Sequence, residues 1–349
     1  MTAAGSDPAL DALLLPFASG QLDWPQRGSL FLRARDGGTL HRQSIPSLVC
    51  EQSFKPAHDA LLRSGLQARM SGDDTGWPCV LLLPPRQRDE ARALFAQAWT
   101  RAQAGGIVVA SMANDEGAKS GQADFEKLFG PAHALSKHKC RVFWARRGDD
   151  GDGDADVLAA WTLLDAPRAI AAGRFVSRPG VFAWDRIDAA SALLAEHLPD
   201  TLAGSGADLG AGYGYLSTEL LARCPGITDL HLYEAEARAL DCARSNLQAY
   251  TGAVALDFRW HDVTVGLPQR YDFIVSNPPF HAQQRQSRPD IGRAFIAAAA
   301  EALRPRGELW LVANRQLPYE QVLDTRFGEV ETLAQRDGFK VVRARRGAA

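Results

Sequence analysis

The chain has few cysteines, and no two of them are spaced to bind zinc. The five in its 349 residues stand far apart and are odd in number, so neither a C-x-x-C metal site nor a disulfide framework is predicted. They are Cys50, Cys79, Cys140, Cys224 and Cys242. The eight histidines form no H-E-x-x-H pattern. These absences favour a protein that holds no metal.

Long apolar runs are also missing. No segment approaches the roughly 20 apolar residues that a membrane-spanning helix needs. The N-terminus has no basic stretch followed by an apolar core, as a secretory signal would have. We therefore expect a cytoplasmic protein without a membrane partner.

The chain lacks a strong excess of either charge. Lys and Arg number 39 against 41 Asp and Glu, a net charge of −2, which is not typical of a strongly basic nucleic-acid binder. Basic residues nevertheless gather at 137–147 and at 336–346. Such runs are usually solvated surface, and phosphate contact is the alternative interpretation.

The most informative motif present is Asn277-Pro278-Pro279-Phe280, which follows an apolar segment expected to be a strand at 271–276. Proline donates no backbone hydrogen bond, so the carbonyls beside it are available as acceptors. The amide oxygen of Asn277 and the carbonyl of Pro278 can together bind an –NH₂ group. Phe280 can stack on the flat ring that carries this group. The motif therefore predicts a site for a planar amine or amide.

A glycine turn lies upstream, and its spacing points to a nucleoside-containing ligand. Gly210, Gly212 and Gly214 can take positive φ and let a ligand approach the backbone. Glu234 follows Gly214 by twenty residues, an offset that suits the hydroxyls of a ribose. The spacing is not the G-x-G-x-x-G of dinucleotide folds, and Asp208 would repel a pyrophosphate. A carboxylate there can instead face the cationic methionyl part of S-adenosylmethionine.

The second half alternates between apolar segments and helical patterns, which predicts a doubly wound parallel sheet of the Rossmann type. Strands are expected near 206–209, 229–233, 255–260, 271–276 and 307–313, with two more near 329–335 and 338–344. Asp262 follows the third of these, where it can accept from an adenine amino group or simply close a turn. Ligands of such sheets lie beyond the carboxyl ends of the strands. We expect all of these site residues to meet there.

The same order of pieces recurs in the first half, which predicts two tandem α/β domains. The glycine- and aspartate-rich stretch 148–154 reads as a linker. We expect a degenerate domain over 1–155 and a catalytic domain over 156–349. Glu51 ends an apolar run as Glu234 does, but Leu83 stands where Asn277 stands, and Arg86 replaces Phe280. The first copy is therefore expected to bind no S-adenosylmethionine and to support the second domain or hold RNA.

The second half resembles class I S-adenosylmethionine methyltransferases, and more narrowly the ribosomal-RNA guanine-N2 methyltransferases of the small-subunit methyltransferase C type. The resemblance covers roughly 175–345. It rests on the pieces at 178–182, 208–214, 276–281, 307–314, 317–319 and 338–344. Ala183 departs from the pattern, which has a serine after the Gly-Val-Phe run.

The resemblance implies methyl transfer to the exocyclic N2 of a guanine in ribosomal RNA, most simply 16S rRNA, as naked RNA or in the subunit. The large-subunit rRNA enzymes, an adenine-amino methyltransferase and a protein-glutamine methyltransferase remain alternatives, because an Asn-Pro-Pro-aromatic motif serves all these acceptors. A non-catalytic RNA-binding protein is a further alternative. The sequence leaves open which guanine is modified and whether the chain is an oligomer.

Overall fold

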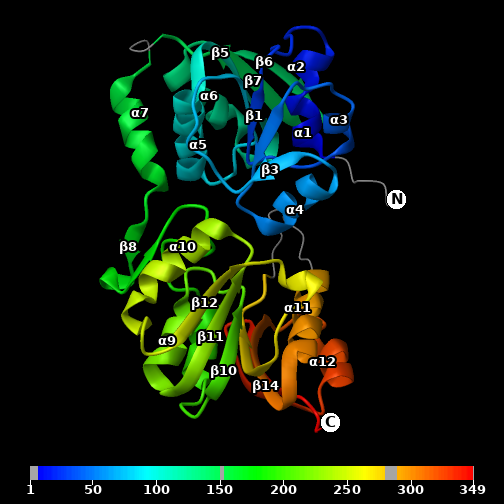
Figure 1. Cartoon of the computed structure of the whole chain (residues 1–349), viewed down its shortest axis with the longest axis vertical. Helices are drawn as coiled ribbons and strands as arrows, with labels where there is room; N and C mark the ends of the chain where they lie inside the picture. Colours follow the sequence, from blue (N-terminus) through cyan, green and yellow to red (C-terminus); the bar gives the residue numbers. More distant parts are fainter. Residues whose placement is uncertain (1–6, 150–152, 280–288, 349) are drawn as a thin grey trace. The chain divides into compact units, whose positions relative to one another are not determined.

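The computed structural model describes residues 7–149, 153–279 and 289–348. Two compact units make up the chain, Met1–Ala166 and Pro167–Ala349 (Figure 1). The division was expected after residue 155, but helix α7 (Ala155–Thr162) packs on α5 (Arg88–Arg101) of the first unit. The Arg92 guanidinium of α5 lies 5.3 Å from the ring centroid of Trp161 in α7.

The first unit is built on a seven-stranded sheet with the order β3-β2-β1-β4-β5-β7-β6. Only β7 runs antiparallel to its neighbours. The strands are β1 Ser29–Leu32, β2 Leu48–Glu51, β3 Gln67–Arg69, β4 Trp77–Leu82, β5 Ala102–Ala113, β6 His133–Lys137 and β7 Cys140–Arg146. Its other helices are α1 Pro8–Leu13, α2 Leu15–Ala18, α3 Gly38–His41, α4 Lys55–Arg63 and α6 Ala118–Phe129.

The second unit has a seven-stranded sheet with the order β12-β11-β10-β13-β14-β16-β15. Its strands are β10 Ala203–Leu209, β11 Gly226–Glu234, β12 Ala255–Trp260, β13 Tyr271–Ser276, β14 Leu303–Asn314, β15 Glu329–Arg336 and β16 Phe339–Arg345. Its helices are α8 Ala189–His197, α9 Tyr215–Arg223, α10 Ala237–Asn246, α11 Pro289–Ala302 and α12 Glu320–Arg326. A separate hairpin pairs β8 (Arg168–Ile170) with β9 (Phe175–Ser177). All seven strands predicted for this half are present.

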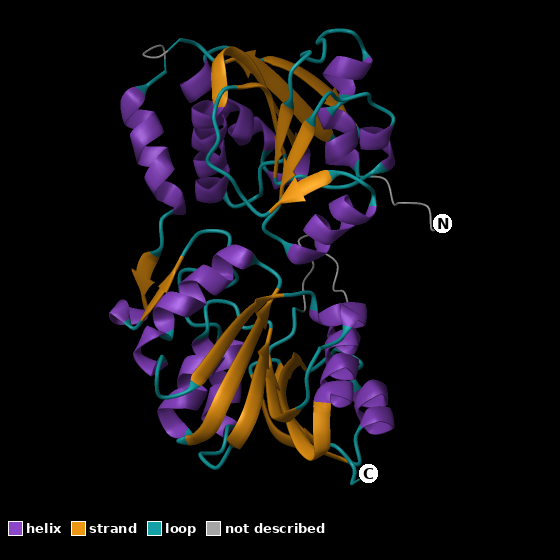
Figure 2. Cartoon of the chain, in the orientation of Figure 1, coloured by secondary structure: helices purple, strands orange, loops and turns teal. Residues whose placement is uncertain are grey.

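Each sheet is covered on both faces by helices (Figure 2), so its central strands contribute to two apolar cores. Successive side chains of a strand point to opposite faces. In β4, Leu82 therefore enters one core and Leu81 the other. In β14, Leu311 and Trp310 divide in the same way. Burial on both sides explains the continuous apolar runs in the sequence, because parallel sheets with two covered faces have no solvated side.

The two sheets repeat one another down to a local irregularity. Both have the order 3-2-1-4-5-7-6 when the strands are numbered within each seven-stranded sheet. The pairing of β4 with β5 shifts register between Trp77 and Cys79, and that of β13 with β14 shifts between Tyr271 and Phe273. This repetition is what a duplicated domain predicts. No helix in the described residues is long and apolar enough to cross a bilayer.

Candidate active site

Parallel pairing brings four strand ends of the second unit to one edge of its sheet. Leu209, the last residue of β10, pairs with Tyr233 of β11 and with Ser276 of β13. Glu234, the last residue of β11, pairs with Trp260 of β12. The polar residues expected to act together lie at these ends or within two residues of them. The sheet thus gathers the glycine turn, Glu234, Asp262 and Asn277 along its carboxyl edge.

The glycine turn bends sharply away from β10. Gly210, Gly212 and Gly214 all have positive φ (74°, 56° and 87°), a region that favours glycine. A Cβ placed on Gly210 would lie 3.8 Å from the carbonyl oxygen of Asn277, so the turn and the Asn-Pro-Pro motif are direct neighbours. A Cβ on Gly212 would meet no atom of another part of the described chain within 4 Å. The backbone at Gly212 therefore faces open space.

Glu234 braces this turn. Its Oε2 accepts a hydrogen bond from the backbone N–H of Gly212 at 2.8 Å, and its Oε1 accepts from the N–H of Glu236 at 2.8 Å. Burial raises the pKa of Glu234, and these two N–H groups partly oppose the rise. A carboxylate has about four acceptor sites, so the group can still accept from a ligand hydroxyl.

Asp208 is fully buried at the end of β10, next to α9. Its Oδ2 accepts from the Ser217 hydroxyl at 2.7 Å, whereas Oδ1 has no hydrogen-bond partner within the described ranges. Burial raises the pKa of Asp208 to about 7; the Ser217 hydrogen bond lowers it, and the nearby Glu234 raises it further. A buried acceptor without a donor is costly unless a ligand supplies one.

Asp262 closes a turn at the end of β12. Its Oδ1 accepts from the backbone N–H of Thr264 at 2.9 Å and from the Thr264 hydroxyl at 2.6 Å. It thereby caps the short 3₁₀ helix Val263–Val265. This is the turn interpretation of Asp262, and it leaves Oδ2 for a contact at the sheet edge.

Asn277 is held in one orientation by helix α8. Its Nδ2 donates to Asp188 Oδ2 at 2.9 Å and to Ser191 Oγ at 2.8 Å. The amide nitrogen and oxygen diverge from the same carbon, so these bonds direct Oδ1 away from α8. Ser276 fixes the backbone alongside, because its hydroxyl donates to the Leu209 carbonyl at 2.8 Å.

Sequence reasoning missed Asp188 and Ser191. Asp188 is the N-cap of α8 and accepts from the Ser191 backbone N–H at 2.9 Å. That capping pattern before an alanine-rich segment predicts a helix start, but nothing in it points to Asn277. Pro278 is buried beside the amide, and Phe280 lies outside the described residues. No cluster of three or more His, Cys, Asp or Glu in the described parts of the chain could hold a metal ion.

Known proteins share both the sequence and the fold. A model of the methyltransferase small domain family matches residues 172–343. Ribosomal RNA small subunit methyltransferase C of Pseudomonas paraeruginosa (strain DSM 24068 / PA7) is 32% identical over 272 residues, which cover 77% of this chain and 80% of that protein. The protein of that name from Stutzerimonas stutzeri (strain A1501) is 38% identical over 224 residues, 63% of this chain and 65% of that protein. This chain belongs to the ribosomal RNA small subunit methyltransferase C family.

A solved structure of the family extends the likeness to the whole chain. The T. thermophilus 16S rRNA N2 methyltransferase, in complex with AdoMet and guanosine, superposes with a TM-score of 0.79 at 25% identity. The match covers 98% of this chain and 92% of that one, so it includes both Rossmann-like units. The family and the fold class predicted from the sequence are thereby confirmed.

The first unit of this family member has different residues at the matching strand ends. Leu82 pairs with Leu32 as Ser276 pairs with Leu209, so buried Leu83 occupies the position of Asn277. Arg33, directly after β1, has a positive φ and occupies the position of Gly210.

The counterpart of Glu234 in the first unit is Gln52, one residue beyond the Glu51 that the sequence pattern suggested. Leu32 pairs with Glu51 as Leu209 pairs with Tyr233. Gln52 Oε1 accepts from the Phe54 N–H at 2.9 Å, two residues on, as Glu234 Oε1 does from Glu236. A neutral amide thus replaces the acid, while Glu51 itself is paired with Arg69 and Arg101.

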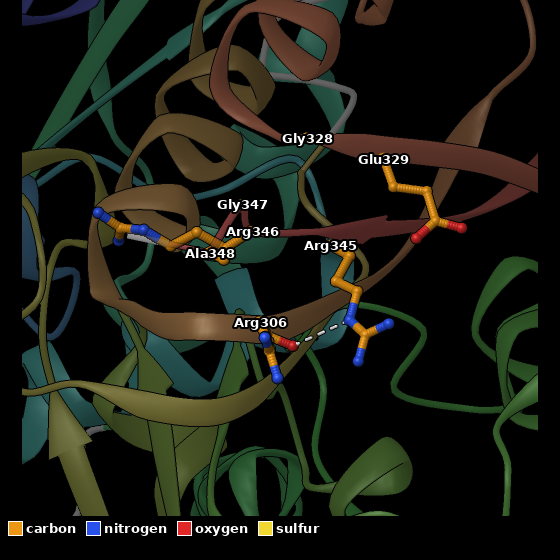
Figure 3. A pocket seen from close by; sticks show the side chains of 7 residues that line it. All are labelled: Arg306, Gly328, Glu329, Arg345, Arg346, Gly347 and Ala348. Atoms are coloured by element: carbon orange, nitrogen blue, oxygen red, sulfur yellow. Dashed lines mark hydrogen bonds between the residues drawn. The ribbon is translucent and has the colours of Figure 1, made fainter.

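Several basic residues of the C-terminal cluster contact other groups of the second unit. Arg336 pairs with Glu196 at 2.6 Å and Arg343 with Glu331 at 2.9 Å. Arg346 donates to the Leu303 carbonyl at 2.7 Å, at the end of α11. The shallow pocket beside it (Figure 3) lies at the sheet edge opposite the predicted site. The residues lining it are Arg306, Gly328, Glu329, Arg345, Arg346, Gly347 and Ala348.

Proposed function

We infer that this chain transfers a methyl group from S-adenosylmethionine to the exocyclic N2 amino group of a guanine in 16S ribosomal RNA. The family supports the reaction, and the relative solved with AdoMet and guanosine supports the donor and the base. Its partner is ribosomal RNA or the ribosomal subunit. Because that substrate is cytoplasmic, we expect the chain in the cytoplasm.

The observation that carries the proposal is the orientation of Asn277 beside Gly210. Asp188 and Ser191 occupy the amide nitrogen, so the acceptor end of the side chain is turned toward the sheet edge. A site for an amino group needs an acceptor at this place, not a donor. The opposite orientation of the amide would present two N–H groups to the substrate and repel it.

The residues at this edge fit S-adenosylmethionine. The buried Asp208 Oδ1 has no partner in the described chain and suits the donor's cationic methionyl part. The open space in front of the Gly212 backbone leaves room for a ligand to approach. Glu234 would accept from the ribose hydroxyls, and Asp262 Oδ2 from the adenine amino group. When bound, the donor supplies a methyl group activated by a positively charged sulfur.

Asn277 and Pro278 would prepare the amino group for attack. The lone pair of an aromatic amine is delocalised into its ring, which makes the nitrogen a poor nucleophile. Two acceptors, Asn277 Oδ1 and the Pro278 carbonyl, would draw on its two N–H bonds and favour a pyramidal nitrogen. Positioning and preorganised dipoles then supply most of the rate enhancement. No general base is needed beforehand, because the N–H becomes strongly acidic only as the new bond forms.

Phe280 keeps its predicted role as the residue that stacks on the target base. A base inside a duplex must leave its stack before its edge can be modified, and an aromatic side chain then replaces the lost stacking. The position of Phe280 directly after the two prolines suits this role.

The test offers radiolabelled S-adenosylmethionine to the purified chain with four acceptors. These are intact small subunits, deproteinised 16S rRNA, large subunits and a ribosome-free protein extract, all from cells that lack this chain. We expect label in 16S rRNA, recovered as N2-methylguanosine after digestion to nucleosides. The comparison between subunits and free RNA shows which form is the substrate.

Other outcomes would contradict the proposal in distinct ways. Label in large-subunit RNA would show that the chain is a guanine-N2 methyltransferase of the large subunit and not of the small one. Recovery of N6-methyladenosine or methylated glutamine would show that the acceptor is not guanine. A chain that binds the donor and RNA but labels none of the four acceptors would be a binding protein.

A further inference from the structure

Phe182 is a large apolar side chain left in solvent close to the predicted site. It is 66% exposed, although the residue before it, Val181, is only 4% exposed and packs in an apolar cluster with Tyr213. No aromatic or cationic side chain within the described ranges covers the Phe182 ring. Its neighbour Trp184 differs, because the Arg168 guanidinium lies 5.4 Å from its ring centroid.

The segment that carries Phe182 is fixed to the glycine turn. The Tyr213 hydroxyl, between Gly212 and Gly214, donates to the Arg186 carbonyl at 3.1 Å. The Arg238 guanidinium donates to the Pro179 carbonyl at 2.7 Å. Ala183 has a φ of 49°, a conformation that alanine rarely adopts. The chain thus holds an unfavourable backbone turn directly after an exposed ring.

The segment around Phe182 carries more basic than acidic residues, unlike the chain as a whole. Residues 167–187 contain four arginines and a single aspartate, whereas the whole chain has a net charge of −2. The Arg186 side chain is 72% exposed and, within the described residues, forms an ion pair only with its exposed neighbour Asp185, at 2.8 Å. Such pairs are weak in water and do not withhold a guanidinium from a phosphate. An exposed ring and an exposed guanidinium on one short segment are typical of a single-stranded nucleic-acid surface.

We propose that Phe182 stacks on a base of the rRNA strand that flanks the target guanine, and that Arg186 contacts a phosphate of the same strand. The proposal rests on the proposed function, because it assigns this segment to the RNA and not to the donor. A guanine turned out of its helix leaves its neighbours partly unstacked, and an aromatic face beside the site compensates for that loss. Position 182 would then contribute to RNA affinity and leave the chemistry unchanged.

The experiment compares Phe182→Ala, Phe182→Trp and Arg186→Ala in the full chain, with Leu163→Ala as a matched control. Leu163 is also an exposed apolar residue, 68% accessible, but belongs to the first unit. Binding of a fluorescein-labelled single-stranded RNA of about 16 nucleotides is measured by anisotropy over a range of salt concentrations. Methylation kinetics on the active acceptor and calorimetric titration with S-adenosylmethionine accompany it.

Phe182→Ala is expected to raise the RNA Kd and the KM for the acceptor about 5- to 100-fold, with kcat and the donor Kd unchanged. Phe182→Trp is expected to retain wild-type affinity, because it keeps an aromatic face. Arg186→Ala is expected to lower the slope of log Kd against log salt by about 1, whereas Phe182→Ala leaves that slope unchanged. Leu163→Ala is expected to match the wild type throughout.

Equal RNA affinity in Phe182→Ala and wild type would overturn the proposal, as would a donor Kd that rises as much as the RNA Kd. A wild-type chain that binds the RNA but methylates no acceptor would refute the proposed function, while the affinity comparison at position 182 would still decide this inference. A wild-type chain that does not bind the RNA would refute this inference, whereas labelling of the four acceptors would still decide the proposed function.

Discussion

At the scale of single residues, Asn277 separates chemistry from donor binding. Its amide is held by α8, and its assigned partner is the substrate amino group. Asn277→Ala is expected to lower kcat about 100-fold or more, by analogy with removal of one polar group from a preorganised site. The donor Kd, measured by calorimetry, is expected to stay within about threefold of wild type, because its assigned contacts come from the glycine turn. Equal loss of both would show that Asn277 does not act on the amino group alone.

Two further variants make this experiment sharper. Ser191→Ala removes one acceptor from the Asn277 amide nitrogen but keeps the helix cap of Asp188, so we expect a partial loss of kcat and little change in melting temperature. Gln335→Ala removes an exposed amide on the edge strand β15 and is expected to behave like wild type. A Ser191→Ala enzyme as active as wild type would show that α8 does not position Asn277.

Asp208 makes stability depend on pH near neutrality. Burial raises its pKa from 3.8 to about 7, so the folded state holds this proton more tightly than the unfolded state. The resulting stability is fully present below about pH 4 and is lost as the pH rises through about 7. Asp208→Asn cannot ionise and can still accept from Ser217. Its melting temperature relative to wild type, without ligand, is expected to rise from pH 5 to pH 8.

The size of that change follows from the pKa shift. Between pH 5 and pH 8 the wild type passes through about two of the three pKa units, an upper limit of about 3 kcal/mol, which amounts to several degrees in a chain of this size. Differential scanning calorimetry of both proteins at the two pH values measures it. A melting-temperature difference that is constant or falls with pH would show that Asp208 does not titrate in this range.

At the scale of the element, the glycine turn is expected to tolerate a methyl group structurally but not functionally. Gly212 and Gly338 both have positive φ, and a Cβ on either meets no atom of another described segment within 4 Å. Alanine at each position therefore costs a similar amount, about 1 kcal/mol of backbone strain. We expect equal losses of melting temperature, but a donor Kd raised more than about tenfold only in Gly212→Ala. Similar donor affinities in the two variants would exclude close approach of the ligand at Gly212.

At the scale of the whole molecule, the chain is expected to bind one donor in spite of its two similar sheets. The first unit has Arg33, Gln52 and Leu83 where the second has Gly210, Glu234 and Asn277. Calorimetry with S-adenosylmethionine should therefore give one site per chain. Gln52→Glu restores the acid alone and is expected to leave the count at one. Two sites in the wild-type chain would show that the first unit binds the donor.

Much of the fold could be predicted because the sheets are buried on both faces. Continuous apolar segments separated by helical patterns predicted β10 to β14 and the late pair β15 and β16, each within a few residues. The position of Glu51 shows the limit of this reasoning. An apolar run does not say which of its last two residues leaves the sheet, so the equivalence with Glu234 was wrong by one residue and only the strand pairing identified Gln52.

The candidate site could be predicted where its residues follow strand ends, and not where it depends on contacts across the fold. Asp208, Glu234 and Asn277 each follow or end a strand, so their convergence was expected. The hydrogen bond from Asn277 to Asp188 joins residues 89 positions apart, and no local pattern indicates it. Asp262 could not be assigned from the sequence alone. The same side chain can both close a turn and face a ligand, and the surrounding sequence does not distinguish the two roles.

Arg33 has a consequence for why glycines occupy the other copy of the same bend. It adopts a φ of 52° directly after β1, where Gly210 has 74° after β10. The reversal out of the sheet is thus achievable with a long side chain attached, so geometry alone does not demand glycine there. In the second unit, the missing side chain at this bend leaves room for a ligand. A substitution that fills this room but keeps the positive φ should therefore abolish cofactor binding without unfolding the protein.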